Sequence, residues 1–364
     1  MSNKVTFSDA SFERDPERAI EYEFVLATEN AALNAIRWVG CGDKESADAA
    51  ACEAIRRTFD IVDICGEVVS GEGVKDDAPG IFQGERLGTW KSGSPRFDIA
   101  LDPIDGTFNL ARGMANSISV IGALQILPGV SSRMLELPSY YSHKMAFGRH
   151  VARAVAGESS KVNWLDQPLE ETLRLMARIL GKRMPELVVL VMDRPRNEIF
   201  VTQTRAAGAT LRMISDGDIA AAVSPALPDS GIDLYVGIGG TPEGILAAAA
   251  LRSLGGDIQM RMWFRSDAER KELCGDLSHS ELVRVYSAEE IVPGKGAIFC
   301  ATGISESPLL QGIKLHGKTA ITHSIVTHAR NRTVRYIRAV HDLEMKTVQL
   351  ETEIKSAGRE QLVS

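Results

Sequence analysis

The chain has 364 residues and a mass of 39.5 kDa, which is long enough for two packed layers or two closely joined subdomains. Hydrophobic residues make up 44% of the chain and charged residues 24%, a composition that excludes a disordered protein. The formal net charge of −7 excludes a general attraction to nucleic acid or to an anionic membrane, and neither is expected as a partner.

Other global features favour a protein of the reduced cytoplasm. No stretch of about 18 consecutive apolar residues exists, so the sequence predicts no transmembrane helix. The polar first residues lack the apolar core of a secretory signal. The five cysteines are odd in number and form no CxxC pair, which argues against a disulfide scaffold and against a zinc site made of cysteines.

Acidic side chains are concentrated in residues 40–110, which hold 14 acidic against 7 basic residues and therefore the whole net charge of −7. The remaining 34 acidic and 34 basic residues cancel. Charge counting alone favours a solvated acidic face for this stretch, and a site that binds cations is the alternative.

The first half of the chain has the pattern of helices followed by strands. Residues 1–16 are predicted to form a loose arm. An apolar stripe predicts a helix over 17–39, and a second helix is predicted over 46–59. Strand-like runs follow at 67–70, 97–101 and 117–126. Glycine-rich turns separate these runs, which indicates an antiparallel or mixed sheet packed on helices.

The second half alternates short apolar strands with helices. Amphipathic or apolar helices are predicted over 167–181 and 242–254. Short strands are predicted at 187–192, 210–214, 233–240 and 296–303, and a separate late strand at 333–340. This alternation indicates a three-layer α/β arrangement for the second half, and the absence of a low-complexity linker indicates that the halves pack closely.

Carboxylates gather at predicted strand ends within the acidic stretch. DPIDGT supplies Asp102 and Asp105, which a turn fixed by proline can point to the same side. Asp48 lies early in the second helix, and GEGVKDD supplies Glu72 and Asp76. Close carboxylates repel one another unless cations lie among them, and oxygen ligands suit Mg²⁺ or Mn²⁺. Two such ions about 3.5–4 Å apart would clamp a phosphate and activate a water.

Longer motifs carry a resemblance to a known family. The chain is similar to the class II fructose-1,6-bisphosphatases in GDKESAD, SGEGVKDDAP, DIALDPIDGT, DRPRNE, ISDGDIAAAV and GIGGTPEGILAAAALRSLGGDIQ. That family includes bacterial dual fructose-1,6-/sedoheptulose-1,7-bisphosphatases. DPIDGT alone resembles the wider lithium-sensitive, metal-dependent sugar phosphatase superfamily. The resemblance covers about residues 19–350 and implies an α/β (α+β layered) fold, the five-layer αβαβα sandwich of that superfamily.

The resemblance implies two metal sites that hold Mg²⁺ or Mn²⁺, with a third ion at phosphate-bound stages by analogy with the superfamily. Asp48 and Glu72 match the ligands of one ion. Asp102, Asp105 and Glu243 match the ligands of the other.

Catalytic and substrate-binding roles also follow from the resemblance, which implies in-line attack of water on phosphorus without a phosphoenzyme. Asp76 resembles the acid that helps to activate the water, and Thr107 can hydrogen-bond the water or the scissile phosphate. The guanidinium forks of Arg194 and Arg196 suit a second phosphate. The other positions that match substrate contacts are Asp105, Gly106, Tyr141, Pro195, Asp216, Gly217, Asp218 and Gly240.

The chain departs from the family pattern at Val74, Phe108, Asn109 and Asn197, where the family commonly has an acid, arginine, methionine and histidine. Because the core ligands are present, we expect hydrolysis of the 1-phosphate of fructose 1,6-bisphosphate, with sedoheptulose 1,7-bisphosphate as a further candidate. A phosphatase of another phosphosugar or a cyclitol phosphate is the main alternative. A catalytically silent sugar-phosphate sensor is disfavoured by the intact set of acids.

The predicted organisation has a boundary near residue 180. Residues 17–180 are expected to form a metal-binding α+β subdomain. Residues 181–364 are expected to form an α/β substrate-binding subdomain whose C-terminal part packs back on the first. By resemblance, the partners are a sugar phosphate and further copies of the chain, as a homodimer or homotetramer. Asp105→Ala is expected to lose activity without unfolding, and Arg196→Ala to weaken bisphosphate binding.

Overall fold

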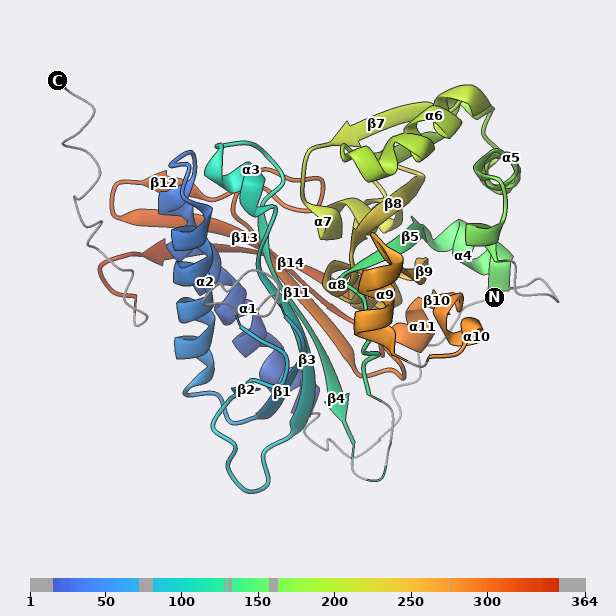
Figure 1. Cartoon of the computed structure of the whole chain (residues 1–364). Helices are drawn as coiled ribbons and strands as arrows, with labels where there is room; N and C mark the ends of the chain where they lie inside the picture. The colour runs from blue at the N-terminus through green and yellow to red at the C-terminus, as the bar shows by residue number, and fades with distance from the viewer. Residues whose placement is uncertain are drawn as a thin grey trace, which may run out of the picture.

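The structure is a computed structural model that describes residues 16–71, 81–127, 129, 133–156, 163–275 and 277–346. Residues 1–15 of the predicted N-terminal arm lie outside the described residues, and Pro16 already begins a helix. Two open sheets organise the described chain, with helices around them (Figure 1).

The first sheet is mixed and has eight strands within the described residues, in the order β12-β13-β11-β4-β3-β1-β2, with β14 paired to β13. The strands are β1 (Cys65–Ser70), β2 (Arg86–Leu87), β3 (Arg96–Asp105), β4 (Ile118–Ile126), β11 (Ala297–Gly303), β12 (Lys314–His316), β13 (Thr319–His328) and β14 (Thr333–Asp342). β1 runs parallel to β3, whereas β3 runs antiparallel to β4. This confirms the mixed sheet predicted from the glycine-rich turns.

The second sheet has six strands within the described residues, in the order β10-β9-β5-β8-β6-β7. They are β5 (Tyr141–Phe147), β6 (Val188–Met192), β7 (Thr210–Ile214), β8 (Leu234–Gly240), β9 (Asp257–Trp263) and β10 (Tyr286–Ser287). β6 runs parallel to β7 and β8, and β5 runs antiparallel to β8 and β9.

The prediction that the strands of the second half share one α/β arrangement is wrong for 296–303, whereas 333–340 belongs to the C-terminal part that is expected to pack back on the first half. The structure places them, as β11 and β14, in the first sheet, where β11 pairs with β4 and β13. Every residue of β11 is buried. An apolar run in the sequence predicts that a strand is buried, but it does not show which strand pairs with it. The chain changes sheets between β4 and β5 and returns at β11. The expected subdomain boundary at residue 180 stays a prediction.

The helices confirm those predicted over 17–39, 46–59, 167–181 and 242–254. The α-helices are α1 (Pro16–Ala35), α2 (Lys44–Phe59), α3 (Thr107–Ala111), α4 (Arg149–Ala156), α5 (Leu169–Leu180), α6 (Glu198–Ala207), α7 (Asp218–Val223), α8 (Thr241–Leu254), α9 (Asp267–Cys274), α10 (His279–Leu282) and α11 (Ala288–Ile291). Short 3₁₀ helices are η1 (Ile36–Trp38), η2 (Trp164–Asp166), η3 (Met184–Glu186), η4 (Pro195–Asn197) and η5 (Ser224–Ala226). Along the described ranges, no helix is both long and apolar enough to span a membrane.

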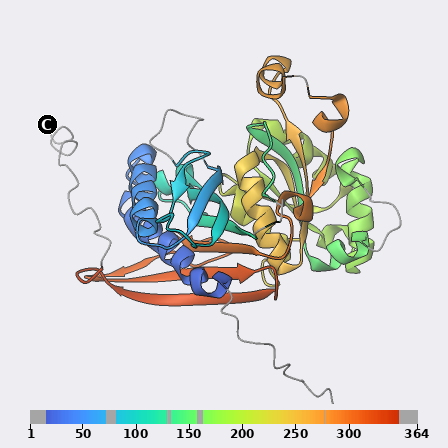
Figure 2. The same ribbon diagram turned by 90° about the horizontal axis from the view of Figure 1, so that it is seen from below.

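Helices and sheets alternate in five layers (Figures 1 and 2), and three apolar cores lie among them. Phe24 and Phe59 belong to the core between α1, α2 and the first sheet. Leu246 belongs to the core between the two sheets, where α7 and α8 lie. Trp164 and Leu173 belong to the core on the far side of the second sheet, beside α4, α5 and α6. The order helix, sheet, helix, sheet, helix confirms the layered α/β sandwich.

α8 is the element that lets the two sheets approach each other. Its alanine run, Ala247–Ala250, is fully buried, as expected for a helix that is apolar all round. A Cβ atom at Gly122 of β4 would lie only 3.3 Å from the Cβ of Ala249, so small residues set this spacing. Pro242 occupies the first turn of α8, where its missing N–H costs nothing. The start of α8 is thereby fixed beside the ends of β3 and β8.

Candidate active site

A polar pocket of about 220 Å³ lies where the end of β3 meets the starts of α7 and α8. Five segments that are distant in the sequence contribute to it. The predicted site residues that line it are Asp102, Asp105, Gly106, Thr107, Tyr141, Arg194, Arg196, Asp216, Asp218, Gly240 and Glu243. We call this cavity the polar pocket.

The other predicted site residues lie elsewhere. Asp48 is on α2 and is not among the residues that line the polar pocket. Pro195 begins η4 between the two arginines, and Gly217 precedes α7 and lines a neighbouring cavity. Glu72 and Asp76, together with the departure Val74, lie outside the described residues.

The irregular end of β3 turns its carboxylates into the polar pocket. Proline cannot donate to a strand ladder, and the pairing of β3 with β4 shifts register between Asp102 and Asp105, on either side of Pro103. The amide of Ile104 instead donates to Oδ1 of Asp102 at 3.0 Å. Gly106 has a φ of +88°, and a Cβ there would collide with the carbonyl of Asn116, so only glycine fits.

Asp105 connects the first sheet to α7. Its buried carboxylate accepts hydrogen bonds from the amides of Ile219, at 3.0 Å, and Ala220, at 3.4 Å. Burial raises the pKa of the Asp105 carboxyl well above its usual range, and the charges of nearby carboxylates, Asp216 first among them, raise that pKa further. A cation in the polar pocket would oppose both effects.

Glu243 lies in the first turn of α8 and folds back over the end of β8. A Cβ atom at Gly240 would collide with its carboxylate, so this close approach requires glycine. The Oε2 atom of Glu243 is buried and accepts no hydrogen bond from the described residues. A buried carboxylate oxygen without a donor is destabilising, and a bound cation would satisfy it.

Asp102, Asp105 and Glu243 give the polar pocket carboxylate oxygens, the type of ligand that a hard divalent ion prefers. Within the described residues, no three His, Cys, Asp or Glu side chains converge closely enough to form a ready-made metal group. The predicted ligand Glu72 falls outside this part of the chain. The two-metal arrangement stays a prediction.

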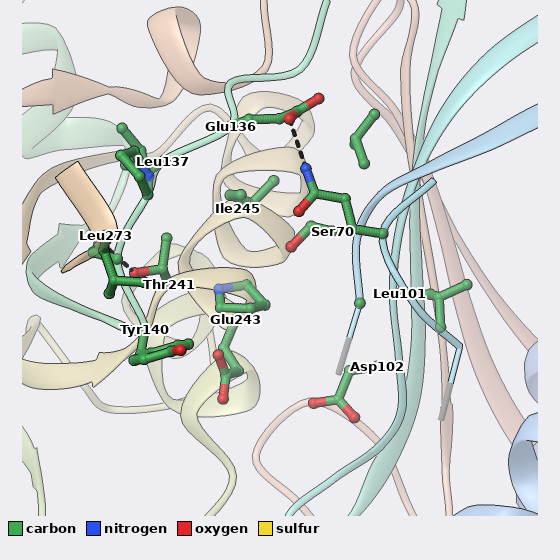
Figure 3. A pocket seen from close by; sticks show the side chains of 16 residues that line it. Ser70, Leu101, Asp102, Glu136, Leu137, Tyr140, Thr241, Glu243, Ile245 and Leu273 are labelled. Atoms are coloured by element: carbon green, nitrogen blue, oxygen red, sulfur yellow. Dashed lines mark hydrogen bonds between the residues drawn. The ribbon is translucent and has the colours of Figure 1, made fainter. Parts of the chain in front are cut away.

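A second pocket, of about 310 Å³, adjoins the polar pocket and shares Asp102 and Glu243 with it. Figure 3 shows both carboxylates at the same end of this second pocket. Apolar side chains such as Leu101 and Ile245 line other parts of it, and the amide of Gln83 donates to Glu136 at 2.6 Å. The two shared carboxylates thus border both cavities.

Arginines face the carboxylates from the second sheet. Arg194 pairs with Asp216 at 3.0 Å, and this charge opposes the burial that raises the pKa of Asp216. Arg196 donates through Nε to the carbonyl of Ile238 at 2.9 Å, and its guanidinium lies 4.6 Å from the ring centre of Tyr141. These contacts hold the Arg196 guanidinium beside Tyr141 in the lining of the polar pocket.

Comparison with known proteins decides the family. A family model described as bacterial fructose-1,6-bisphosphatase, glpX-encoded, matches residues 18–341. The chain belongs to this family. Fructose-1,6-bisphosphatase class 2 of Haemophilus influenzae is 38% identical over 339 residues, which cover 90% of this chain and 97% of the relative. Fructose-1,6-bisphosphatase 1 class 2 of Escherichia coli K12 is 34% identical over 348 residues, covering 93% and 99%.

Two of the departures from the glpX family pattern have structural roles. Asn197 is fully buried, accepts from the amide of Ile238 at 2.7 Å and donates to the carbonyl of Met192 at 3.1 Å. Asn109 is also fully buried, accepts from the hydroxyl of Ser215 at 2.8 Å and donates to the carbonyl of Asp216 at 3.3 Å. Neither asparagine lines the polar pocket, but both hold segments of the chain that carry residues of the pocket.

Phe108 is the described departure that is exposed. Its ring is 41% accessible and lies 4.2 Å from the guanidinium of Arg112 and 6.0 Å from that of Arg194. Its backbone amide donates to Asp216 at 3.2 Å. The phenyl ring is thus placed beside an arginine that lines the polar pocket.

The sequence analysis missed Lys144 and Tyr235, which are fully buried beneath the polar pocket. Lys144 contacts Asp218, and the hydroxyl of Tyr235 donates to the same carboxylate. A lysine in a short strand is ordinarily assigned to solvent, and β5 was not among the predicted strands. In the structure Lys144 shares a face of β5 with Ser142 and Ala146, which are also buried, but the sequence alone gives no signal of this.

Proposed function

We propose that this chain is a divalent-metal-dependent phosphatase that hydrolyses the 1-phosphate of fructose 1,6-bisphosphate to fructose 6-phosphate and phosphate. One observation carries the proposal: carboxylates from β3 and α8 and the Arg196–Tyr141 pair line the same polar pocket. A phosphate at the carboxylates and a second phosphate at the arginine describe a bisphosphate. Membership of the glpX family supports the same substrate.

The charges in the polar pocket support a requirement for cations. Its lining carboxylates, Asp102, Asp105, Asp216, Asp218 and Glu243, outnumber its two arginines. Each phosphate monoester adds about −1.5 to −2 charges at pH 7, so the pocket alone would repel a bisphosphate. Cations would reverse this balance.

Two ions, Mg²⁺ or Mn²⁺, with a third at phosphate-bound stages, are part of the proposal. Asp102, Asp105 and Glu243 would hold one ion, and Asp48 with Glu72 the other. When bound, the ions supply charge neutralisation at the scissile phosphate and a water of lowered pKa.

The remaining chemistry is assigned to side chains of this chain. The oxygen of a water forms the new bond to phosphorus while the bond from phosphorus to O1 of the sugar breaks, and a proton returns to O1. Asp76 is proposed to take the water's proton. The Thr107 hydroxyl, which donates to the carbonyl of Ile104 at 2.9 Å, keeps acceptor capacity at the pocket. Arg196 and Tyr141 hold the 6-phosphate, and Asp216 and Gly240 hold the sugar.

The test is phosphate release, with Mn²⁺ or Mg²⁺, from a panel of phosphosugars and cyclitol phosphates. Fructose 1,6-bisphosphate is expected to be hydrolysed, with activity lost on chelation and restored by the metal. Phosphate release only from other compounds would show that fructose 1,6-bisphosphate is not the substrate. Binding of the bisphosphate without any release would indicate the catalytically silent sensor instead.

A second candidate is the same hydrolysis on another phosphosugar, and the position of Phe108 favours it. An aromatic ring beside Arg194 changes the edge of the polar pocket where the family commonly has arginine. Sedoheptulose 1,7-bisphosphate, which is one carbon longer, is included in the panel for the same reason. If the ring selects the substrate, Phe108→Arg will change the ratio of the two bisphosphatase activities.

We also propose three broader properties from the resemblance to the family. The enzyme belongs to the lithium-sensitive phosphatase superfamily, so Li⁺ is expected to inhibit it. It works in the cytoplasm as a homodimer or homotetramer. Lithium inhibition curves and light scattering of the purified protein test the first and last of these.

A further inference from the structure

A lysine is buried in the layer directly beneath the polar pocket. Lys144 belongs to β5, and its side chain is fully buried. Its ammonium lies 2.5 Å from Oδ2 of Asp218 and donates to the carbonyl of Gly240 at 2.8 Å. Removing a lysine from water is unfavourable, so an unpaired one would not remain buried here. The pairing with Asp218 makes its position specific.

The same contacts occupy the carboxylate of Asp218. Lys144 contacts Oδ2, and the hydroxyl of Tyr235 donates to Oδ1. The Asp218 side chain is only 5% exposed. Both oxygens therefore have protein partners, although the family resemblance matches Asp218 to a segment that binds sugar hydroxyls. Asp216, two residues earlier, is the more exposed carboxylate of this segment and is held by Arg194.

The backbone beside Lys144 is built for this close approach. A Cβ atom at Gly239 would collide with the Asp218 carboxylate and lie 2.9 Å from Nζ of Lys144. A Cβ atom at Gly244 would lie 3.1 Å from the Lys144 side chain. Glycines thus stand on both sides of Gly240, the residue whose carbonyl accepts from Lys144 and which precedes α8.

Lys144 consequently joins the starts of two helices. Asp218 begins α7, and Gly240 precedes α8, which carries Glu243. Asp105 also restrains α7, because its carboxylate accepts from the amide of Ile219. Movement of the lysine would therefore displace both the segment with Asp216 and the helix start with Glu243.

We propose that Lys144 is a positioning residue of the phosphatase site, and that Asp218 acts through Lys144 rather than as a direct sugar ligand. The ion pair fixes the starts of α7 and α8, so that Asp216, Gly240 and Glu243 lie at the substrate. This inference rests on the proposed phosphatase function. It assigns the ion pair chiefly to substrate binding, since Asp216 and Gly240, two of the three groups that it fixes, are the proposed sugar contacts.

The experiment compares Lys144→Met, Asp218→Asn and the double variant in steady-state kinetics and in calorimetric binding of fructose 6-phosphate. A misplacement of about 1 Å costs up to about 100-fold in activity, so Lys144→Met is expected to lose about 10- to 100-fold in kcat/KM, chiefly through KM. Each single variant leaves one buried charge unpaired, whereas the double variant leaves none. The loss in the double variant is therefore expected to be smaller than the product of the single losses.

A matched control is Lys182→Met, which removes a lysine that follows α5 and pairs at 2.6 Å with Asp233, the residue before β8, away from the polar pocket. This variant is expected to keep the KM of the wild type. Melting temperatures of all four variants identify any that do not fold. If Lys144→Met does not fold, the double variant, which has no unpaired charge, takes its place in the test, and its KM is expected to be raised.

Three results would overturn the proposal: a folded Lys144→Met or double variant with the KM of the wild type, single losses that multiply, or the same KM change in Lys182→Met. An inactive wild type would contradict the phosphatase function instead. Calorimetry with fructose 6-phosphate would still measure the effect of Lys144 on sugar-phosphate binding.

Discussion

The carboxylate of Asp105 accepts a hydrogen bond from the backbone amide of Ile219 at 3.0 Å, across 114 residues of sequence. Asp105 ends β3 in the first sheet, and Ile219 lies in the first turn of α7, between the sheets. The residue proposed as a metal ligand is thus also the cap of a helix that borders the polar pocket. Substitutions of Asp105 must separate these two roles.

Asp105→Asn is expected to lose at least about 100-fold in kcat, since even groups that only support metal ligands are worth about 10- to 100-fold. Asparagine keeps an oxygen that can accept from the α7 amides. Asp105→Ala removes this cap as well and is expected to lower stability by a further 1 kcal/mol or so, about the usual effect of a lost N-cap. Kinetics and denaturant unfolding of both variants measure the two effects.

Metal removal provides the control for Asp105→Asn. In chelator, the variant is expected to be at least as stable as the wild type, because it removes a buried charge that neighbouring carboxylates repel. Added Mn²⁺ should then raise the melting temperature of the wild type more than that of the variant. Full turnover in Asp105→Asn, or equal stabilisation of both proteins by Mn²⁺, would contradict the role of Asp105 as a metal ligand.

Arg196→Ala is expected to raise the KM for fructose 1,6-bisphosphate by about 10- to 100-fold with a smaller change in kcat. A hydrogen bond to a charged group contributes about 1.5–3 kcal/mol, and Arg196 is held beside Tyr141 for such a contact. Fructose 1-phosphate lacks the second phosphate, so its KM should change little. The exposed Arg205 on α6 supplies the control variant, Arg205→Ala. Equal effects of Arg196→Ala on the KM of both substrates would contradict the role of Arg196 in binding the second phosphate.

The sequence predicts those parts of the fold and site that depend on local pattern. The alanine-rich helix over 242–254 and the turn at DPIDGT are encoded by neighbouring residues, and both are found in the structure. The sheet to which β11 belongs depends on its pairing with β4, which is far away in the sequence. Because β11 is buried along its whole length, its residue pattern does not indicate this partner. The pairing of Lys144 with Asp218 likewise joins residues 74 apart, which no local pattern reports.

Asn197→Ala is expected to lower the free energy of unfolding by about 2–6 kcal/mol, because two buried backbone groups lose their partners at about 1–3 kcal/mol each. Those groups are the amide of Ile238 and the carbonyl of Met192, where β8 and β6 reach the polar pocket. Urea unfolding measures the change. Asn163→Ala, at an exposed asparagine that donates to Asp166, should change stability by no more than about 0.5 kcal/mol. A similarly small effect of Asn197→Ala would show that the two hydrogen bonds of Asn197 are dispensable.

His143 makes the stability of β5 dependent on pH. Its ring stacks on Phe200 at 4.9 Å, and burial lowers its pKa to about 4. The unfolded chain binds this proton near the usual pKa of about 6.5, so between those values the unfolded state holds more protons and stability falls as the pH falls. From pH 7.5 to 5, this histidine is expected to cost about 2 kcal/mol of stability.

His143→Phe tests this pH dependence because it keeps an aromatic ring against Phe200 and removes the titrating group. Urea unfolding of the wild type and the variant at several pH values should give curves that diverge by about 2 kcal/mol between pH 7.5 and 5. Burial also lowers the pKa of His341 to about 4, but this histidine is present in both proteins and cancels in the difference. Parallel curves would exclude His143. Because β5 also carries Tyr141 and Lys144, divergent curves would locate the acid-sensitive part of the fold in the strand beneath the polar pocket.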